Sequence, residues 1–232
     1  MLDDFGSNIE SMNTLNTIVL AEGSQPPKKS PTEELSQIWK SLIKFGTKLK
    51  LERKCYLFRA GEHNKHVYIS LSGYLMLTKN KTLLDIVEPG QSLGAALLNS
   101  GNSIQTYPVS AMSIDHSEVL QLSADVAFEL MNSNPFINEY FIRQFKDRMS
   151  YLQLCRSIES LPVTNRIAFF LLQKKSLLKN TTITRKMIAQ AVNTTQETVI
   201  RTLANFEKQK IIEYAGRKII LIDSSHLEKL CL

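Results

Sequence analysis

The sequence predicts an α+β protein in which an antiparallel β barrel or sandwich is followed by a long helix and a C-terminal helix-turn-helix. Three observations predict this order. Short runs of near-alternating apolar residues fill positions 47–122, helical spacing takes over at 123–160, and residues 183–209 place a tight corner between two short amphipathic segments. With 232 residues, 43% of them hydrophobic and 22% charged, the chain has the composition of an ordinary globular protein.

The N-terminal part divides into an arm and a β domain. Residues 1–30 are rich in Ser, Asn and Thr and end in SQPPKKSP, which can bury little apolar surface, so we expect a flexible arm. From Pro31, EELSQIWKSLIKFG places apolar residues at helical spacing around Trp39 and predicts a helix. Alternating runs follow at 47–62, 66–79, 82–93 and 107–122, separated by turn signals. We therefore expect a β domain at 31–132.

A long helical region is predicted from Ser123 to Ser160, and Pro162 marks its end. Within the stretch 133–160, seven residues follow the 4-3-4-3-4-3 spacing of a two-stranded coiled coil: Ile137, Phe141, Gln144, Arg148, Tyr151, Cys155 and Ile158. This spacing predicts a dimerisation helix and a homodimer. Because Gln144 and Arg148 interrupt the apolar row, the alternative that this face packs on the chain's own β domain stays open.

The net charge of +6 is concentrated in the C-terminal domain, residues 161–232. That domain holds 12 Lys or Arg and 5 Asp or Glu, whereas residues 1–160 hold 16 and 17. The asymmetry favours an anionic partner, double-stranded DNA before a membrane. Since no apolar run approaches the roughly 18 residues of a membrane span and no signal peptide is recognised, we expect a cytoplasmic protein with no membrane partner.

The segment ITRKMIAQAVNTTQETVIRTLANFEKQ predicts two helices joined by a corner. Thr184 can cap a first helix that runs to Val192, and Asn193 suits a left-handed corner where most residues are strained. The second helix is expected to begin at Thr194, because Thr194 and Glu197 have the spacing of a capping box. Its buried stripe would be Val199, Leu203 and Phe206.

The outer face of the second helix then presents Gln196, Glu197, Ile200 and Arg201 near its N-terminal end, the part of a recognition helix that enters the major groove. Arg pairs with guanine, Glu accepts from cytosine, and Gln pairs with adenine, so we expect Gln196, Glu197 and Arg201 to contact bases. Glu197 also has two other possible roles, as a cap partner and as an i, i+4 partner of Arg201.

The segment KIIEYAGRKIILID predicts a β hairpin that turns at Ala215 and Gly216. Its tip carries Arg217 and Lys218, which we expect to contact DNA phosphates.

In these features the chain resembles the Crp/Fnr family of bacterial transcription regulators. The resemblance covers about residues 33–232 and is strongest in LPVTNRIAFFLL and in ITRKMIAQAVNTTQETVIRTLANFEKQKIIEYAGRKIIL. It implies a double-stranded β-helix (jelly roll) of the cyclic-nucleotide-binding type, a dimerisation helix and a winged helix-turn-helix. It also implies phosphate contacts by Arg185 and Thr195, and RNA polymerase as a partner of a family activator.

The family's recognition helix carries Arg-Glu-Thr-Val-x-Arg and binds a TGTGA-like half-site. This chain keeps Glu197, Thr198, Val199 and Arg201 but has Gln196 in place of the first Arg. The resemblance therefore implies a pseudo-palindrome whose half-sites keep a TGA-like core and differ at the base that Gln196 faces.

The residues that bind cyclic AMP in the family are replaced here. The corresponding positions are Gly94, Ala95, Gln105, Tyr151 and Leu152, and no arginine lies between Arg59 and Arg143 to neutralise a cyclic phosphate. A buried phosphate without a fixed cation is poorly compensated, so we do not expect cyclic AMP to bind in the family manner. The effector is unknown, and Arg148 is the nearest cation for an anionic one.

No cofactor, metal or catalytic residue is predicted. An iron–sulfur cluster of the family type needs cysteines near the N-terminus, and residues 1–54 contain none. Cys55, His63, His66 and His116 offer possible haem ligands, but their sequence context favours surface positions. We expect no enzyme, since no Ser-His-Asp set or phosphate-binding glycine loop is present. An alternative function is a ligand-binding signalling module whose winged helix contacts proteins.

Overall fold

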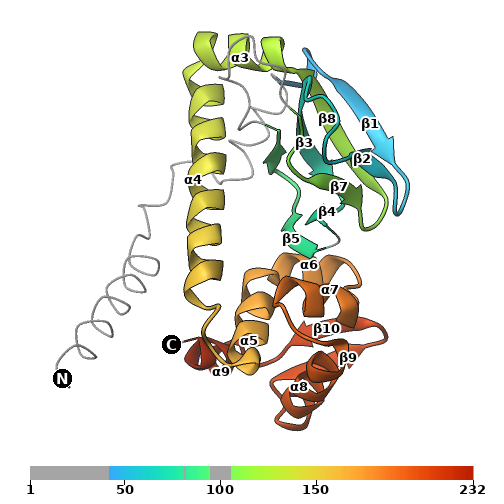
Figure 1. The fold of residues 1–232 in the computed structure, drawn as a ribbon, viewed down its shortest axis with the longest axis vertical. Helices are drawn as coiled ribbons and strands as arrows, with labels where there is room; N and C mark the ends of the chain where they lie inside the picture. The colour runs from blue at the N-terminus through green and yellow to red at the C-terminus, as the bar shows by residue number, and fades with distance from the viewer. Residues whose placement is uncertain (1–41, 81, 95–105, 232) are drawn as a thin grey trace, which may run out of the picture. The chain divides into compact units, whose positions relative to one another are not determined.

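The computed structural model describes residues 42–80, 82–94 and 106–231. Ile43–Leu232 forms a compact unit that contains both the β strands and the C-terminal helices. The predicted arm and nearly all of the helix predicted from Pro31 lie outside the described residues, as do Ala95 and Gln105. Figure 1 shows the β strands in blue to green and the C-terminal elements in orange to red.

Each of the four predicted β runs forms two strands. The bounds are β1 Thr47–Leu51, β2 Tyr56–Phe58, β3 His66–Ser72, β4 Leu75–Lys79, β5 Thr82–Val87, β6 Ser92–Leu93, β7 Ser110–Ser113 and β8 Ser117–Ser123. The second run turns at Gly73 and the third at Gly90, and both glycines have left-handed φ angles, of 73° and 89°. The prediction of alternating strands separated by glycine turns is confirmed.

The strands form two antiparallel four-stranded sheets, β1-β8-β3-β6 and β2-β7-β4-β5. Alternate residues of each strand point into the space between the sheets and form one apolar core: Phe58, Tyr68, Leu75, Leu77, Val87, Leu93, Tyr107, Ala111 and Val119. The roll made by these sheets therefore has a packed interior.

The helical region predicted from Ser123 to Ser160 consists of two helices with a break between them. Helix α3 spans Ala124–Ser133 and α4 spans Pro135–Ser157. Asn134 between them has extended backbone angles, and its side chain accepts hydrogen bonds from the N–H groups of Phe136 and Ile137. Pro135 explains the break, because the residue before a proline avoids the helical region and proline suits the first position of a new helix.

The C-terminal elements form a winged helix-turn-helix. Their bounds are α5 Val163–Gln173, α6 Lys175–Asn180, α7 Arg185–Ala191, α8 Gln196–Lys208, β9 Ile212–Ala215, β10 Lys218–Leu221 and α9 Ser224–Leu230. Helix α5 packs against α7, α8 and α9, and strands β9 and β10 pair antiparallel. In the part of the chain that the structure describes, no helix is long and apolar enough to cross a membrane.

Candidate nucleic-acid interface

The first helix of the motif, α7, is fixed by its cap and its buried face. The Thr184 hydroxyl accepts a hydrogen bond from the N–H of Met187 at 3.2 Å, as the predicted cap requires. Ile188, Ala189 and Val192 are buried and form the inner face of the helix.

The corner after α7 is held by one strained residue and two hydrogen bonds. Asn193 has φ 51°, the left-handed conformation that the sequence predicted. The N–H of Thr194 donates to the carbonyl of Ala189 at 2.9 Å. Arg166 of α5 donates from Nη1 to the Val192 carbonyl at 2.8 Å and thereby ties the corner to α5. This role of Arg166 has no signal in the sequence, because nothing local to LPVTNRIAFF indicates a partner 26 residues later.

The recognition helix α8 begins one residue later than predicted. Its N-cap is Thr195, whose hydroxyl accepts from the N–H of Thr198 at 3.2 Å and lies 3.0 Å from the Thr198 hydroxyl. The predicted capping box of Thr194 and Glu197 is therefore wrong. Consecutive threonines offered two possible caps, and the backbone after Asn193 brings the second into position. The Glu197 carboxylate is consequently not used as a cap.

Helix α8 separates a buried stripe from an exposed row. Val199, Leu203 and Phe206 are at most 1% exposed and pack into the winged-helix core, as predicted. Gln196, Glu197, Ile200 and Arg201 are exposed near the N-terminal end of the helix, with Glu197 and Arg201 opposite the stripe. Among the described residues, no ion pair joins Glu197 to Arg201, so neither charge is committed to the other. This row presents amide, carboxylate and guanidinium groups at the N-terminal end of a helix, the groups that pair with base edges.

The residues predicted to contact phosphates have different local environments. Thr195 is exposed at the start of α8 and carries the cap. The Arg185 guanidinium lies over the Tyr214 ring, 5.0 Å from its centroid. Burial raises the pKa of Tyr214, while the nearby Arg185 acts in the opposite direction. Arg185 is thus oriented by an aromatic face within the hairpin.

The hairpin turns one residue later than predicted. Ala215 pairs with Lys218, so the turn residues are Gly216, with φ 62°, and Arg217. Arg217 is exposed at the tip. Lys218 is half-buried instead, and its ammonium donates to the carbonyls of Lys179 and Asn180 at 3.3 and 3.4 Å, where it caps the end of α6.

The roll interior contains aromatic rings near Gly94, which the resemblance assigns to the nucleotide pocket. Phe58 and Tyr107 stack with centroids 3.9 Å apart, and the Tyr107 hydroxyl donates to the His66 carbonyl at 2.9 Å. Gly94 has φ 78°, and a Cβ there would lie 2.8 Å from the same His66 carbonyl. Ala95 and Gln105 lie outside the described residues. In the described ranges, no three His, Cys, Asp or Glu side chains come together as a metal-binding group.

Part of the predicted dimer seam contacts the chain's own roll. Ile137 and Phe141 are 1% and 3% exposed. Gln144 accepts a hydrogen bond from the Ser92 N–H at 3.4 Å, and Arg148 forms an ion pair with Asp85 at 3.4 Å. Further along α4, Tyr151, Cys155 and Ile158 are half-buried, and the Tyr151 ring lies 4.7 Å from the Lys174 ammonium.

A different row of α4 is exposed. Ile142, Phe145, Met149 and Leu152 are 59%, 59%, 42% and 45% exposed, and each lies one residue after a member of the predicted seam. Their 3-4-3 spacing is also the a/d pattern of a coiled coil. We call these four residues the exposed stripe. Leu152, which the resemblance places in the degenerate nucleotide pocket, belongs to it.

Two family models match the chain. A Crp-like helix-turn-helix domain matches residues 165–230, and a cyclic nucleotide-binding domain matches residues 48–134. They correspond in order to the winged helix and to the roll with α3.

Similar proteins carry the same two parts. The transcriptional activator protein Anr of Pseudomonas aeruginosa is 24% identical over 200 residues, which cover 80% of each chain. The structure of FixK2 from Bradyrhizobium japonicum has a TM-score of 0.70 at 18% identity and covers 81% of this chain and 98% of that one. A CRP-family transcriptional regulator from Thermus thermophilus has a TM-score of 0.64 at 20% identity, with coverage of 79% and 96%. With both domains matched in order and the helix-turn-helix formed as described, the chain belongs to the Crp/Fnr family and is a transcription regulator with a DNA-binding helix-turn-helix.

Proposed function

We propose that the protein binds, as a homodimer, a pseudo-palindromic DNA site whose half-sites have a TGA-like core, and that it does so without cyclic AMP bound in the family manner. The observation that carries this proposal is the row Gln196, Glu197 and Arg201, which is exposed on α8 and takes no part in its buried stripe. Those three side chains are free to face DNA because the folding of the domain uses the other side of the helix.

The base contacts follow from the chemistry of the row. Arg201 can donate two hydrogen bonds to guanine, and Glu197 can accept one from the cytosine amino group. Gln196 stands at the N-terminal end, where an amide favours adenine. We assign Arg185, Thr195, Arg217 and Lys218 to the phosphate backbone, which positions the helix without specifying sequence.

The homodimer is supported by the exposed stripe. An isolated helix face with four large apolar side chains at coiled-coil spacing is costly in water. A second copy of α4 offers the same spacing and the same residues, so one stripe can pack on the other about a two-fold axis. We therefore place the dimer contact at Ile142, Phe145, Met149 and Leu152, one residue along from the row that the sequence predicted.

The nucleotide proposal is supported by the roll interior. Phe58 and Tyr107 stack there, and the stretch between Arg59 and Arg143 supplies no arginine to meet a phosphate. A buried phosphate needs such a charge-assisted partner. We propose further that RNA polymerase is the protein partner, which the similarity to a transcriptional activator of Pseudomonas supports.

The test is equilibrium binding of the nucleotide-free protein to two labelled duplexes of equal base composition at one salt concentration. One carries inverted TGA-core half-sites about 10 base pairs apart, centre to centre, and the other carries the scrambled sequence. We expect the first duplex to bind at least about 10³-fold tighter. Equal affinities, or no salt-dependent binding to either duplex, would reject the proposal and favour a winged helix that contacts protein instead.

A further inference from the structure

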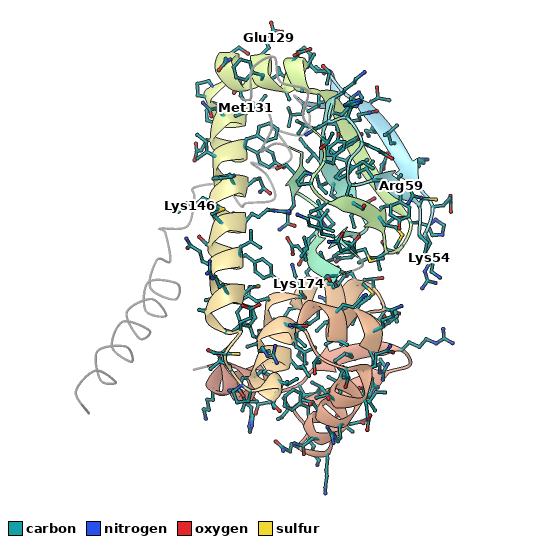
Figure 2. All side chains as sticks on the ribbon, in the orientation of Figure 1. Lys54, Arg59, Glu129, Met131, Lys146 and Lys174 are labelled. Carbon is teal, nitrogen blue, oxygen red and sulfur yellow. The ribbon has the colours of Figure 1, made fainter. Side chains whose placement is uncertain are left out.

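A buried ion pair joins the roll to the DNA-binding domain. The Lys174 ammonium lies 3.1 Å from Oδ1 of Asp85, 3.1 Å from the Ile86 carbonyl oxygen and 3.9 Å from the Glu88 carboxylate. The Lys174 and Asp85 side chains are 7% and 9% exposed. Figure 2 labels Lys174, which stands at the end of α5. A lysine so little exposed needs partners for its charge, and β5 supplies them.

Lys174 is rigidly part of the DNA-binding domain. Its N–H donates to the Phe170 carbonyl of α5 at 3.0 Å, and its carbonyl accepts from the Leu178 N–H of α6 at 3.0 Å. Both helices have fully or nearly fully buried residues in the core that also contains the α8 stripe. The position of the Lys174 ammonium is therefore tied to the position of α8.

Asp85 also contacts the long helix. Its Oδ2 lies 3.4 Å from Nη2 of Arg148 on α4, whereas Oδ1 accepts from Lys174 and from the Ile86 N–H, at 2.7 Å. One carboxylate on β5 thus binds α4 with one oxygen and the DNA-binding domain with the other. Arg148 directly precedes Met149 of the exposed stripe, so the same helix segment carries both contacts.

A second polar contact accompanies this carboxylate. The Tyr74 hydroxyl donates to the Ser176 carbonyl at 3.1 Å and accepts from the Asn180 side chain at 3.0 Å. Tyr74, Leu83 and Ile86 of the roll belong to the same buried cluster as Ile188 of α7. The junction between roll and DNA-binding domain is therefore an apolar contact that includes a few hydrogen bonds and ion pairs. These polar contacts fix its geometry.

We propose that Asp85 is a positioning residue for DNA recognition, which fixes the DNA-binding domain relative to α4 through Lys174 and Arg148. This inference rests on the proposed homodimer. In such a dimer α4 carries the two-fold contact, so the placement of each DNA-binding domain relative to α4 determines the separation of the two α8 helices. Backbone connection alone leaves that placement loose, because the chain passes from α4 to α5 through the short non-helical segment around Pro162.

The consequence is a requirement for one half-site spacing. With the carboxylate in place, both α8 helices meet DNA one helical turn apart, and a changed spacing rotates one half-site away from its helix. Without it, Lys174 loses its nearest carboxylate and α4 loses its ion pair with β5. Each DNA-binding domain can then follow a displaced half-site, so the spacing requirement becomes weaker.

The experiment measures affinity for a series of palindromic duplexes that differ only in half-site spacing, in single base-pair steps, for full-length wild type and variants. For wild type we expect affinity to fall about tenfold or more at two base pairs from the optimum. In Asp85→Asn and Lys174→Met, this difference in affinity between the optimal and the changed spacing should be mostly lost. Asp85→Glu should restore it relative to Asp85→Asn. The matched controls are Asp125→Asn on α3 and Lys175→Met next to Lys174, both exposed, and they should keep the wild-type profile.

Thermal unfolding of each variant separates positioning from stability. A variant that melts at lower temperature but keeps the full spacing contrast shows a merely structural role and overturns the inference. If Asp85→Asn does not fold, Lys174→Met takes its place, because it breaks the same ion pair while Asp85 keeps Arg148 as a partner, and an unchanged profile there overturns the inference equally. A wild-type protein with no preferred spacing contradicts the proposed dimeric function instead.

Discussion

Arg201 and Arg217 are both exposed arginines of the DNA-binding domain, yet they should differ in what they contribute. Arg201 stands in the row on α8, whereas Arg217 stands at the tip of the hairpin. We expect Arg201→Ala to lose about 1–3 kcal/mol of discrimination at one base pair. Arg217→Ala should weaken all sequences alike and lower the slope of log affinity against log salt by about one unit.

Binding of both variants to a panel of single-base substitutions, at several salt concentrations, checks this prediction. If the two variants lose the same affinity on every sequence, then Arg201 does not contact a base. Lys218, the other predicted phosphate ligand, is a less direct probe, since its ammonium already caps α6 and its removal would also disturb that helix.

At this scale the sequence predicted the exposed face of α8 and the Thr184 cap of α7, but not the cap of α8. The stripe of Val199, Leu203 and Phe206 determines the outward row by periodicity alone. The cap could not be settled, because Thr194 and Thr195 are chemically equivalent and only the path of the backbone after Asn193 distinguishes them. The hairpin turn was placed one residue too early, because the strand register that pairs Ala215 with Lys218 is not visible in the local sequence either.

At the scale of elements, the left-handed corner at Asn193 between α7 and α8 can be tested directly by substitution. Asn193 adopts φ 51°, which costs most residues roughly 1–2 kcal/mol. Asn193→Val should therefore lower the free energy of unfolding by about that amount, whereas Asn193→Gly should keep it near the wild-type value. Thermal or denaturant unfolding of the two variants measures the difference, and equal stabilities would show that the corner does not depend on this conformation.

The long helix shows where periodicity stops being informative. Two neighbouring rows of α4 both follow coiled-coil spacing, one through Phe141 and Arg148 and one through Ile142 and Met149. Spacing cannot tell which row meets the chain's own roll, because that depends on contacts such as Gln144 with Ser92 across the fold. The break at Asn134 and Pro135, by contrast, had a local signal in the proline itself.

At the scale of the whole molecule, the exposed stripe predicts the state of assembly. Wild type should sediment at twice the chain mass of 26.3 kDa. Phe145→Glu should shift it towards the monomer, because a charge would be buried in an apolar contact. Ser150→Glu, on the same helix but off the stripe, is the control and should stay dimeric. A Phe145→Glu variant that remains fully dimeric would move the dimer contact elsewhere.

The junction between roll and DNA-binding domain had no sequence signal. Asp85 and Lys174 are 89 residues apart, and each looks like an ordinary surface charge in its own segment. Their pairing depends on how two domains pack, which neither alternation nor helical period encodes. The domain types and their order, in contrast, follow from local patterns and from the match of the helix-turn-helix segment to its family.

The measurement that tests the central claim most directly is selection of bound sequences from a randomised duplex library by the purified, nucleotide-free protein, with and without cyclic AMP at one fixed salt concentration. We predict enrichment of a two-fold symmetric site with a TGA-like core in both arms, at half-sites about one helical turn apart. Enrichment that appears only with cyclic AMP would contradict the proposed independence from the nucleotide. No symmetric site in either arm would contradict the proposed dimeric DNA recognition itself.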